Sequence, residues 1–168
     1  MSNLKTFVAM FSMALLLSVA AFTQQSDIPS LNFEHAEHFW KDAGDTTVVV
    51  NFWATWCAPC VKELPAFEKL NTTYAGHKVK VVLVSLDFKS EVDGKLPAFV
   101  RKKGLKATVI HLNDPDANGW IPKVDEGWSG AIPATLIIHP ESGRKKFMES
   151  ALTFEALEEA VKEVMTEP

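Results

Sequence analysis

The segment around the two cysteines limits the possible folds more than any other part of this sequence. Residues 46–53 carry no charge and are rich in β-branched and aromatic side chains, which is typical of a strand buried on both faces. Residues 58–74 then repeat apolar side chains every three or four positions, which predicts an amphipathic helix that Pro65 should kink. Cys57 and Cys60, the two cysteines of the chain, lie where this strand passes into this helix. The sequence therefore places a pair of thiols at the start of a helix, beside a buried sheet.

The rest of the chain predicts further helices and strands in alternation. The predicted helices cover residues 33–43, 95–103 and 153–165, the last one capped by Thr153. The predicted strands cover residues 79–86, 107–112, 133–138 and 144–148. Residues 113–130 are rich in proline and glycine and predict an irregular or short-helical connection. This order predicts one α/β domain in which helices flank a mixed sheet.

The N-terminal segment predicts export. Residues 7–22 carry no charge, and this run of about sixteen residues is shorter than the roughly 20 that a membrane span needs. Small residues follow its leucine-rich centre, so residues 1–20 are predicted to be a signal peptide, with an uncleaved signal anchor as the alternative. Residues 21–29 then form a lead-in, and residues 30–168 form the folded domain. Both alternatives place that domain outside the cytoplasm, and a periplasmic location is predicted.

Charge and cysteine content exclude several classes of protein. The formal net charge is −4 and no long basic block is present, which argues against nucleic-acid binding. Two cysteines cannot form a disulfide framework or a four-thiolate zinc site. A metal bound by the cysteine pair would need two more ligands, and His35 and His38 are the candidates, but they lie on an apparently amphipathic helix. We therefore predict neither a metal nor an organic cofactor.

The position of the cysteine pair favours redox chemistry. Unpaired N–H groups and the helix dipole at a helix N-terminus stabilise a thiolate, so the pKa of Cys57 should be lowered. Two intervening residues leave Cys60 close enough to form a disulfide with Cys57, and Pro59 stiffens the loop between them. A purely structural disulfide is the alternative, but a loop this short would stabilise the fold by only about 2 kcal/mol, against about 3 for fifteen residues.

Two motifs together resemble those of exported thioredoxin-like proteins of the TlpA/ResA type. The first is Val48-Val-Val-Asn-Phe-Trp-Ala-Thr-Trp-Cys-Ala-Pro-Cys60, followed by Val61-Lys-Glu-Leu-Pro65. The second is Gly130-Ala-Ile-Pro-Ala-Thr135, which opens a predicted strand. The resemblance covers about residues 30–168. It implies a thioredoxin fold with an extra helix–strand segment, residues 95–112, before a cis-proline loop.

The resemblance also implies roles for individual residues. Cys57 would be the exposed nucleophile and Cys60 the buried resolving thiol. Pro133 would be the cis-proline that faces the disulfide, and Ile132 would offer its backbone to an extended substrate. Trp56 and Pro59 are further candidates for substrate binding, with Trp56 partly exposed as a platform.

An acidic residue follows the second cysteine at helical spacing. Glu63 lies three positions after Cys60, so it could relay a proton for that thiol, and a solvated helix carboxylate is the alternative. Cytoplasmic thioredoxins have a buried aspartate where this chain has Asn51, and an amide cannot titrate. This difference agrees with the exported subgroup and favours Glu63 as the acid.

Other aromatic and acidic residues have less specific interpretations. Trp53 is expected to pack beside the motif. Trp120 and Trp128 precede the proline loop and would either rim the substrate groove or pack in the core. Asp87 follows a predicted strand, where a cap or turn residue is common.

These observations predict an exported thiol-disulfide oxidoreductase. The resemblance favours reduction of disulfides in other exported proteins, for example during cytochrome c maturation. Electrons would come from another dithiol protein, possibly embedded in the membrane, because the chain has no second redox centre. The alternatives are a disulfide-forming oxidant and a non-catalytic binding module with a structural disulfide.

Overall fold

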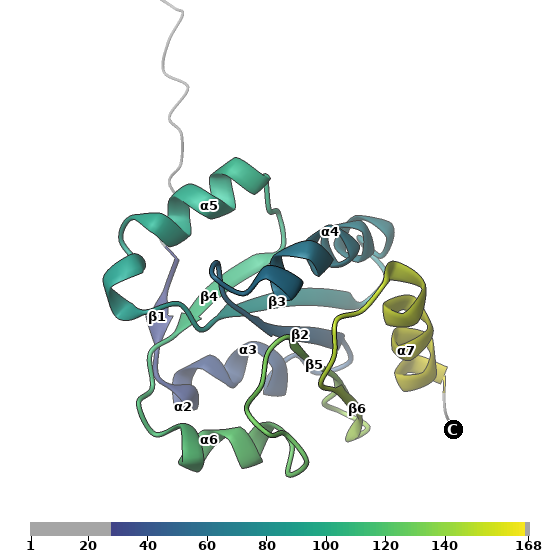
Figure 1. Cartoon of the computed structure of the whole chain (residues 1–168). Helices are drawn as coiled ribbons and strands as arrows, with labels where there is room; N and C mark the ends of the chain where they lie inside the picture. The colour runs from purple at the N-terminus through teal and green to yellow at the C-terminus, as the bar shows by residue number, and fades with distance from the viewer. Residues whose placement is uncertain (1–27, 167–168) are drawn as a thin grey trace, which may run out of the picture.

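A six-stranded mixed sheet forms the centre of the computed structural model, which describes residues 28–166 (Figure 1). The strands are β1 (Ser30–Leu31), β2 (Thr47–Trp53), β3 (Val79–Ser85), β4 (Thr108–Leu112), β5 (Ala134–His139) and β6 (Arg144–Met148). They lie in the order β1-β4-β3-β2-β5-β6. The first four are mutually parallel, whereas β5 and β6 run antiparallel to their neighbours. The predicted mixed sheet is thus confirmed.

Helices cover both faces of this sheet. They are α2 (Phe33–Ala36), α3 (His38–Lys41), α4 (Ala58–Thr73), α5 (Lys95–Lys103), α6 (Ala117–Val124) and α7 (Phe154–Thr166), with a short 3-10 turn η1 (Lys89–Glu91). The predicted helix over 33–43 is divided in two, although Glu37 between the parts keeps helical backbone angles (φ −63°, ψ −22°). The connection over 113–130 contains α6, capped by the side chain of Asp116. None of the helices in the described region is long and apolar enough to cross a membrane.

The alternation of side chains along the strands produces two separate apolar layers. Val49 of β2 packs with α4, α5 and α7 on one face, whereas Val48, Val50 and Phe52 pack with α2, α3 and α6 on the other. Both faces of β2 are therefore buried, which explains why its sequence contains no charge. Figure 1 shows the two groups of helices on opposite sides of the sheet.

The extra helix–strand segment adds an internal strand next to one edge of the sheet. Helix α5 leads into β4, which lies between β1 and β3 rather than at an edge. Gly104 ends α5 in the left-handed conformation (φ 65°), as expected for a glycine that closes a helix. This arrangement agrees with the predicted thioredoxin fold and its extra segment. The predicted signal peptide lies outside the described residues.

Two tryptophans that precede the proline loop belong to the core. Trp120 and Trp128 are buried on the second face, where their rings lie 5.5 Å apart. Trp128 also contacts Phe52, at 4.7 Å between ring centroids, and donates a hydrogen bond from Nε1 to the Ala131 carbonyl (2.8 Å). The possibility that these rings line the substrate groove is therefore wrong, because both tryptophan side chains are buried and pack against other core residues. Trp128 instead holds the proline loop through its hydrogen bond to the Ala131 carbonyl.

Candidate active site

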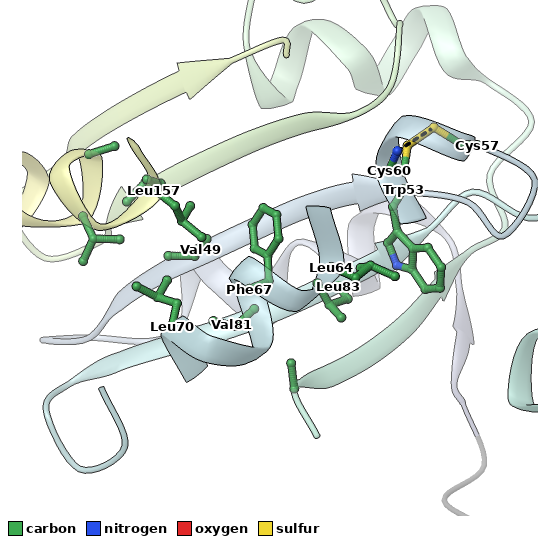
Figure 2. Packing of buried hydrophobic residues seen from close by; sticks show 14 of the residues in the cluster. Val49, Trp53, Cys57, Cys60, Leu64, Phe67, Leu70, Val81, Leu83 and Leu157 are labelled. Atoms are coloured by element: carbon green, nitrogen blue, oxygen red, sulfur yellow. Dashed lines mark hydrogen bonds between the residues drawn. A yellow bond between two sulfur atoms is a disulfide. The ribbon is translucent and has the colours of Figure 1, made fainter. Parts of the chain in front are cut away.

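The two cysteines form a disulfide at the N-terminus of α4 (Figure 2). Cys57 is the N-cap of this helix, and its Sγ accepts a hydrogen bond from the backbone N–H of Cys60 (3.3 Å). A sulfur thus occupies the place where a capping oxygen usually lies. An anion at this position faces unpaired N–H groups and the positive end of the helix dipole. The geometry therefore favours the thiolate form of Cys57 once the disulfide is reduced.

The two sulfurs differ in their access to solvent. Cys57 keeps 6% of its surface exposed, whereas Cys60 is fully buried in the apolar layer around Trp53 and Leu64. A large molecule can therefore approach the disulfide only from the side of Cys57. Figure 2 shows the disulfide at the end of this layer, with Trp53 beside Cys60.

The proline loop faces the same sulfur. The Ile132–Pro133 peptide is cis, as the resemblance implies. The carbonyl oxygen of Ile132 lies 3.8 Å from Sγ of Cys57. Gly130 begins the loop with φ 90°, a conformation that residues with a side chain rarely adopt. The loop thus brings half-buried Ile132 and buried Pro133 to the accessible sulfur, although the two motifs are far apart in the sequence.

Glu63 is buried beneath the motif and held by two donors. Its Oε1 accepts from Nδ2 of Asn51 (2.8 Å), and its Oε2 accepts from the backbone N–H of Leu152 (2.8 Å). The interpretation of Glu63 as a solvated helix carboxylate is wrong, because its side chain is almost completely enclosed. Burial raises the pKa of Glu63, and the two hydrogen bonds, from Leu152 and Asn51, oppose this effect only in part.

A surface cleft gives solvent a path toward this carboxyl group. The cleft has a volume of about 430 Å³, and Pro59, Glu63 and Leu152 are among its lining residues. Glu63 is one turn after Cys60 on α4. A carboxyl with a raised pKa that lies one helical turn from a resolving thiol and lines a surface cleft can accept or return a proton.

The raised pKa of Glu63 has a consequence for stability. The folded protein retains this proton at a pH where the unfolded chain has lost it, so stability should fall as the pH rises through that range. We expect Glu63→Gln to remove this fall. Urea unfolding of the oxidised protein at about pH 5 and about pH 8 measures the effect. The unfolding free energy of the variant, relative to that of the wild type, should be higher at the higher pH.

The control for this experiment is Glu155→Gln, which removes an exposed carboxylate on α7. Its unfolding free energy should follow the wild type across the same pH range. Equal pH dependence in wild type and Glu63→Gln would contradict the assignment of a retained proton to Glu63.

A second buried carboxylate organises the loop before the motif. Both oxygens of Asp87 accept from the backbone N–H of Thr55 (3.1 Å each), and Oδ1 also accepts from Oγ1 of Thr55 (2.5 Å). Oδ2 accepts in addition from Oγ of Ser85 (2.7 Å). The expectation of a simple turn or cap residue missed this role. The pairing of β2 with β3 is what indicates this role. Trp53 is opposite Ser85 in the parallel register, so two residues further along each chain segment Thr55 comes beside Asp87.

The exposed residues around the motif complete the site. Trp56 is 51% exposed and stacks on Phe88, which sequence reasoning did not select. Pro59 is also exposed. His35 and His38 lie on the surface, where they bond to Asn32 and Asp42. Within residues 28–166 no cluster of three or more histidine, cysteine or acidic side chains is arranged to hold a metal.

Comparison with known proteins places this site in a family. A sequence profile described as the AhpC/TSA family matches residues 19–143. The thiol-disulfide oxidoreductase ResA of Oceanobacillus iheyensis is 34% identical over 111 residues, which cover 66% of this chain. The chain spans about half the length of that relative (53%).

Solved structures agree with the assignment of the fold. StoA from Bacillus subtilis is 26% identical, with a TM-score of 0.54 over 69% of this chain and 82% of its own. A thioredoxin-related protein from Neisseria meningitidis serogroup B has a TM-score of 0.63 at 23% identity, over 72% of this chain and 86% of its own. With the profile match, the fold and the cysteine motif in agreement, the chain belongs to the AhpC/TSA family of thioredoxin-like proteins.

Proposed function

We propose that this protein is a thiol-disulfide oxidoreductase that reduces disulfides in partner proteins outside the cytoplasm. The observation that carries the proposal is the position of Sγ of Cys57, which caps α4 and faces the cis-proline loop. A relative named as a thiol-disulfide oxidoreductase supports this activity. The extracytoplasmic location rests on the uncharged segment 7–22 of the sequence.

The two thiols of the motif supply the electrons of the proposed reaction. The thiolate of Cys57 attacks one sulfur of the substrate disulfide, which forms a mixed disulfide and releases the other substrate sulfur as a thiolate. Glu63 in its ionised form accepts the proton of Cys60, and the resulting thiolate attacks Sγ of Cys57. The Cys57–Cys60 disulfide forms as the second substrate thiol leaves, so two electrons have passed to the substrate. A second dithiol protein, possibly embedded in the membrane, must then reduce the motif again.

The direction of electron flow can be tested by equilibration with glutathione. We expect a midpoint potential near the roughly −270 mV of thioredoxin rather than the roughly −120 mV of the oxidant DsbA. A value near that of DsbA would favour disulfide formation as the physiological role. The reduced protein should also reduce insulin catalytically when a dithiol regenerates it. Absence of turnover with every reductant would favour a binding module with a structural disulfide.

A further inference from the structure

Two aromatic rings stand exposed beside the motif. Trp56 is 51% exposed and Phe88 is 66% exposed, and no other large hydrophobic side chain within residues 28–166 is comparably open. Their ring centroids lie 6.1 Å apart, with 22° between the planes. We call these two residues the ring pair. Exposed apolar surface next to a reactive group is characteristic of an interaction site.

The ring pair is positioned by the sheet and by buried hydrogen bonds. Trp56 follows Thr55, and Phe88 follows Asp87, and these two preceding residues are joined by the hydrogen bonds of the Asp87 carboxylate. The strands that lead to them are also bonded at this edge, where Leu86 N–H donates to the Trp53 carbonyl (2.7 Å). The two rings thus lie in segments that follow separate strands, and the hydrogen bonds between Thr55 and Asp87 hold these two segments side by side.

The surroundings of the ring pair favour an apolar ligand over a charged one. The oxygens of Asp87 are buried and already accept from Thr55 and Ser85. The carboxylate of Glu91, at the end of η1, pairs with Lys95 (2.6 Å). The Asp87 carboxylate is thus engaged within the protein, and although Lys89 next to Phe88 is exposed, the two rings themselves offer mainly aromatic carbon to a ligand.

We propose that the ring pair binds a large apolar side chain of the polypeptide that carries the substrate disulfide, and that Phe88 determines this preference. The proposal rests on the proposed function. Trp56 directly precedes Cys57 in the chain, so the ring pair lies close to the sulfur that attacks the substrate. Because consecutive Cα atoms are about 3.8 Å apart, the substrate side chain that reaches the ring pair must lie within about two or three residues of the substrate cysteine. The Ile132 carbonyl borders Cys57 and offers a backbone acceptor to the same extended segment.

The preference can be measured with two disulfide-linked peptides that differ at one position. Two residues from the cysteine, one peptide has phenylalanine and the other has serine. The reduced wild-type protein should react about fivefold to tenfold faster with the phenylalanine peptide. In Phe88→Ala this ratio should fall to about twofold or less, and in Phe88→Leu most of it should return. Rates with hydroxyethyl disulfide, which has no side chain to bind, report the reactivity of Cys57 alone.

The matched control is Lys89→Ala, which shortens the exposed neighbouring side chain and should keep the wild-type ratio with uncharged peptides. An equal ratio in wild type and Phe88→Ala, or no preference in the wild type, would overturn the role of the ring pair. If the reduced wild type reacted with neither the peptides nor hydroxyethyl disulfide, the proposed function itself would fail. The two failures are therefore distinguishable.

Discussion

Replacement of Cys57 by serine should slow disulfide reduction by at least about a thousandfold. A serine hydroxyl at the cap of α4 keeps the hydrogen bond to the Cys60 N–H, so the helix start is preserved. A hydroxyl does not ionise near neutral pH, however, and cannot form a stable bond to a substrate sulfur. Insulin reduction with a regenerating dithiol measures the loss, and circular dichroism checks that the fold is retained.

The matched variant is Cys60→Ser, which retains the accessible sulfur and removes the buried one. It should react once with a substrate disulfide and then accumulate as a mixed disulfide, because no second thiol is present to resolve it. Non-reducing electrophoresis with mass spectrometry would identify Cys57 as the linked residue. Trapping by Cys57→Ser but not by Cys60→Ser would show that the two roles are reversed.

The capping geometry also predicts the acidity of the reduced motif. The Cys60 N–H directed at Sγ of Cys57 should hold the pKa of the Cys57 thiol below that of an ordinary free cysteine. The ultraviolet absorbance of the thiolate in Cys60→Ser, followed against pH, would measure this effect on one thiol alone. An ordinary thiol pKa in that variant would remove the physical basis for a selective nucleophile.

The cysteine motif and its place in the fold could be predicted because they depend on local sequence. A short uncharged run rich in β-branched and aromatic residues favours a strand buried on both faces, and β2 is such a strand. The helix that follows is equally clear from its apolar spacing, and α4 extends over 58–73. The thiol pair lies at their junction, with Cys57 as the N-cap and Cys60 in the first turn of α4, by chain connectivity alone. The proline loop needed the resemblance, because sequence spacing cannot show that a peptide is cis.

The environment of single polar residues could not be predicted in the same way. The local sequence pattern around Glu63 is the same whether its side chain faces solvent or the core. The burial of Glu63 depends on a segment that is distant in sequence, where the backbone N–H of Leu152 donates to its Oε2. Phe88 was overlooked because an isolated aromatic residue after a strand carries no local signal. Its position beside Trp56 follows from the register of β2 with β3 and from the hydrogen bonds between Thr55 and Asp87.

Replacement of Phe67 by alanine should lower the free energy of unfolding by about 3–5 kcal/mol, the largest effect on stability expected at a single position of α4. Its side chain is fully buried in the layer with Val49 and Leu157, and its ring points from α4 toward the sheet (Figure 2). Helix propensity slightly favours alanine, which offsets only a few tenths of a kcal/mol. Urea unfolding of the oxidised protein measures the change.

The same substitution at an exposed ring is the control, and Phe88→Ala should change stability by no more than about 0.5 kcal/mol. The contrast matters because α4 contains Pro65, which lacks the N–H that would bond to the Val61 carbonyl. A helix with one missing hydrogen bond depends more on the packing of its buried face. A loss below about 1 kcal/mol in Phe67→Ala would mean that the disulfide end, rather than this packing, holds α4 against the sheet. A loss in the expected range would mean that the packing of this ring, nearly three turns along the helix from Cys57, holds α4 against the sheet.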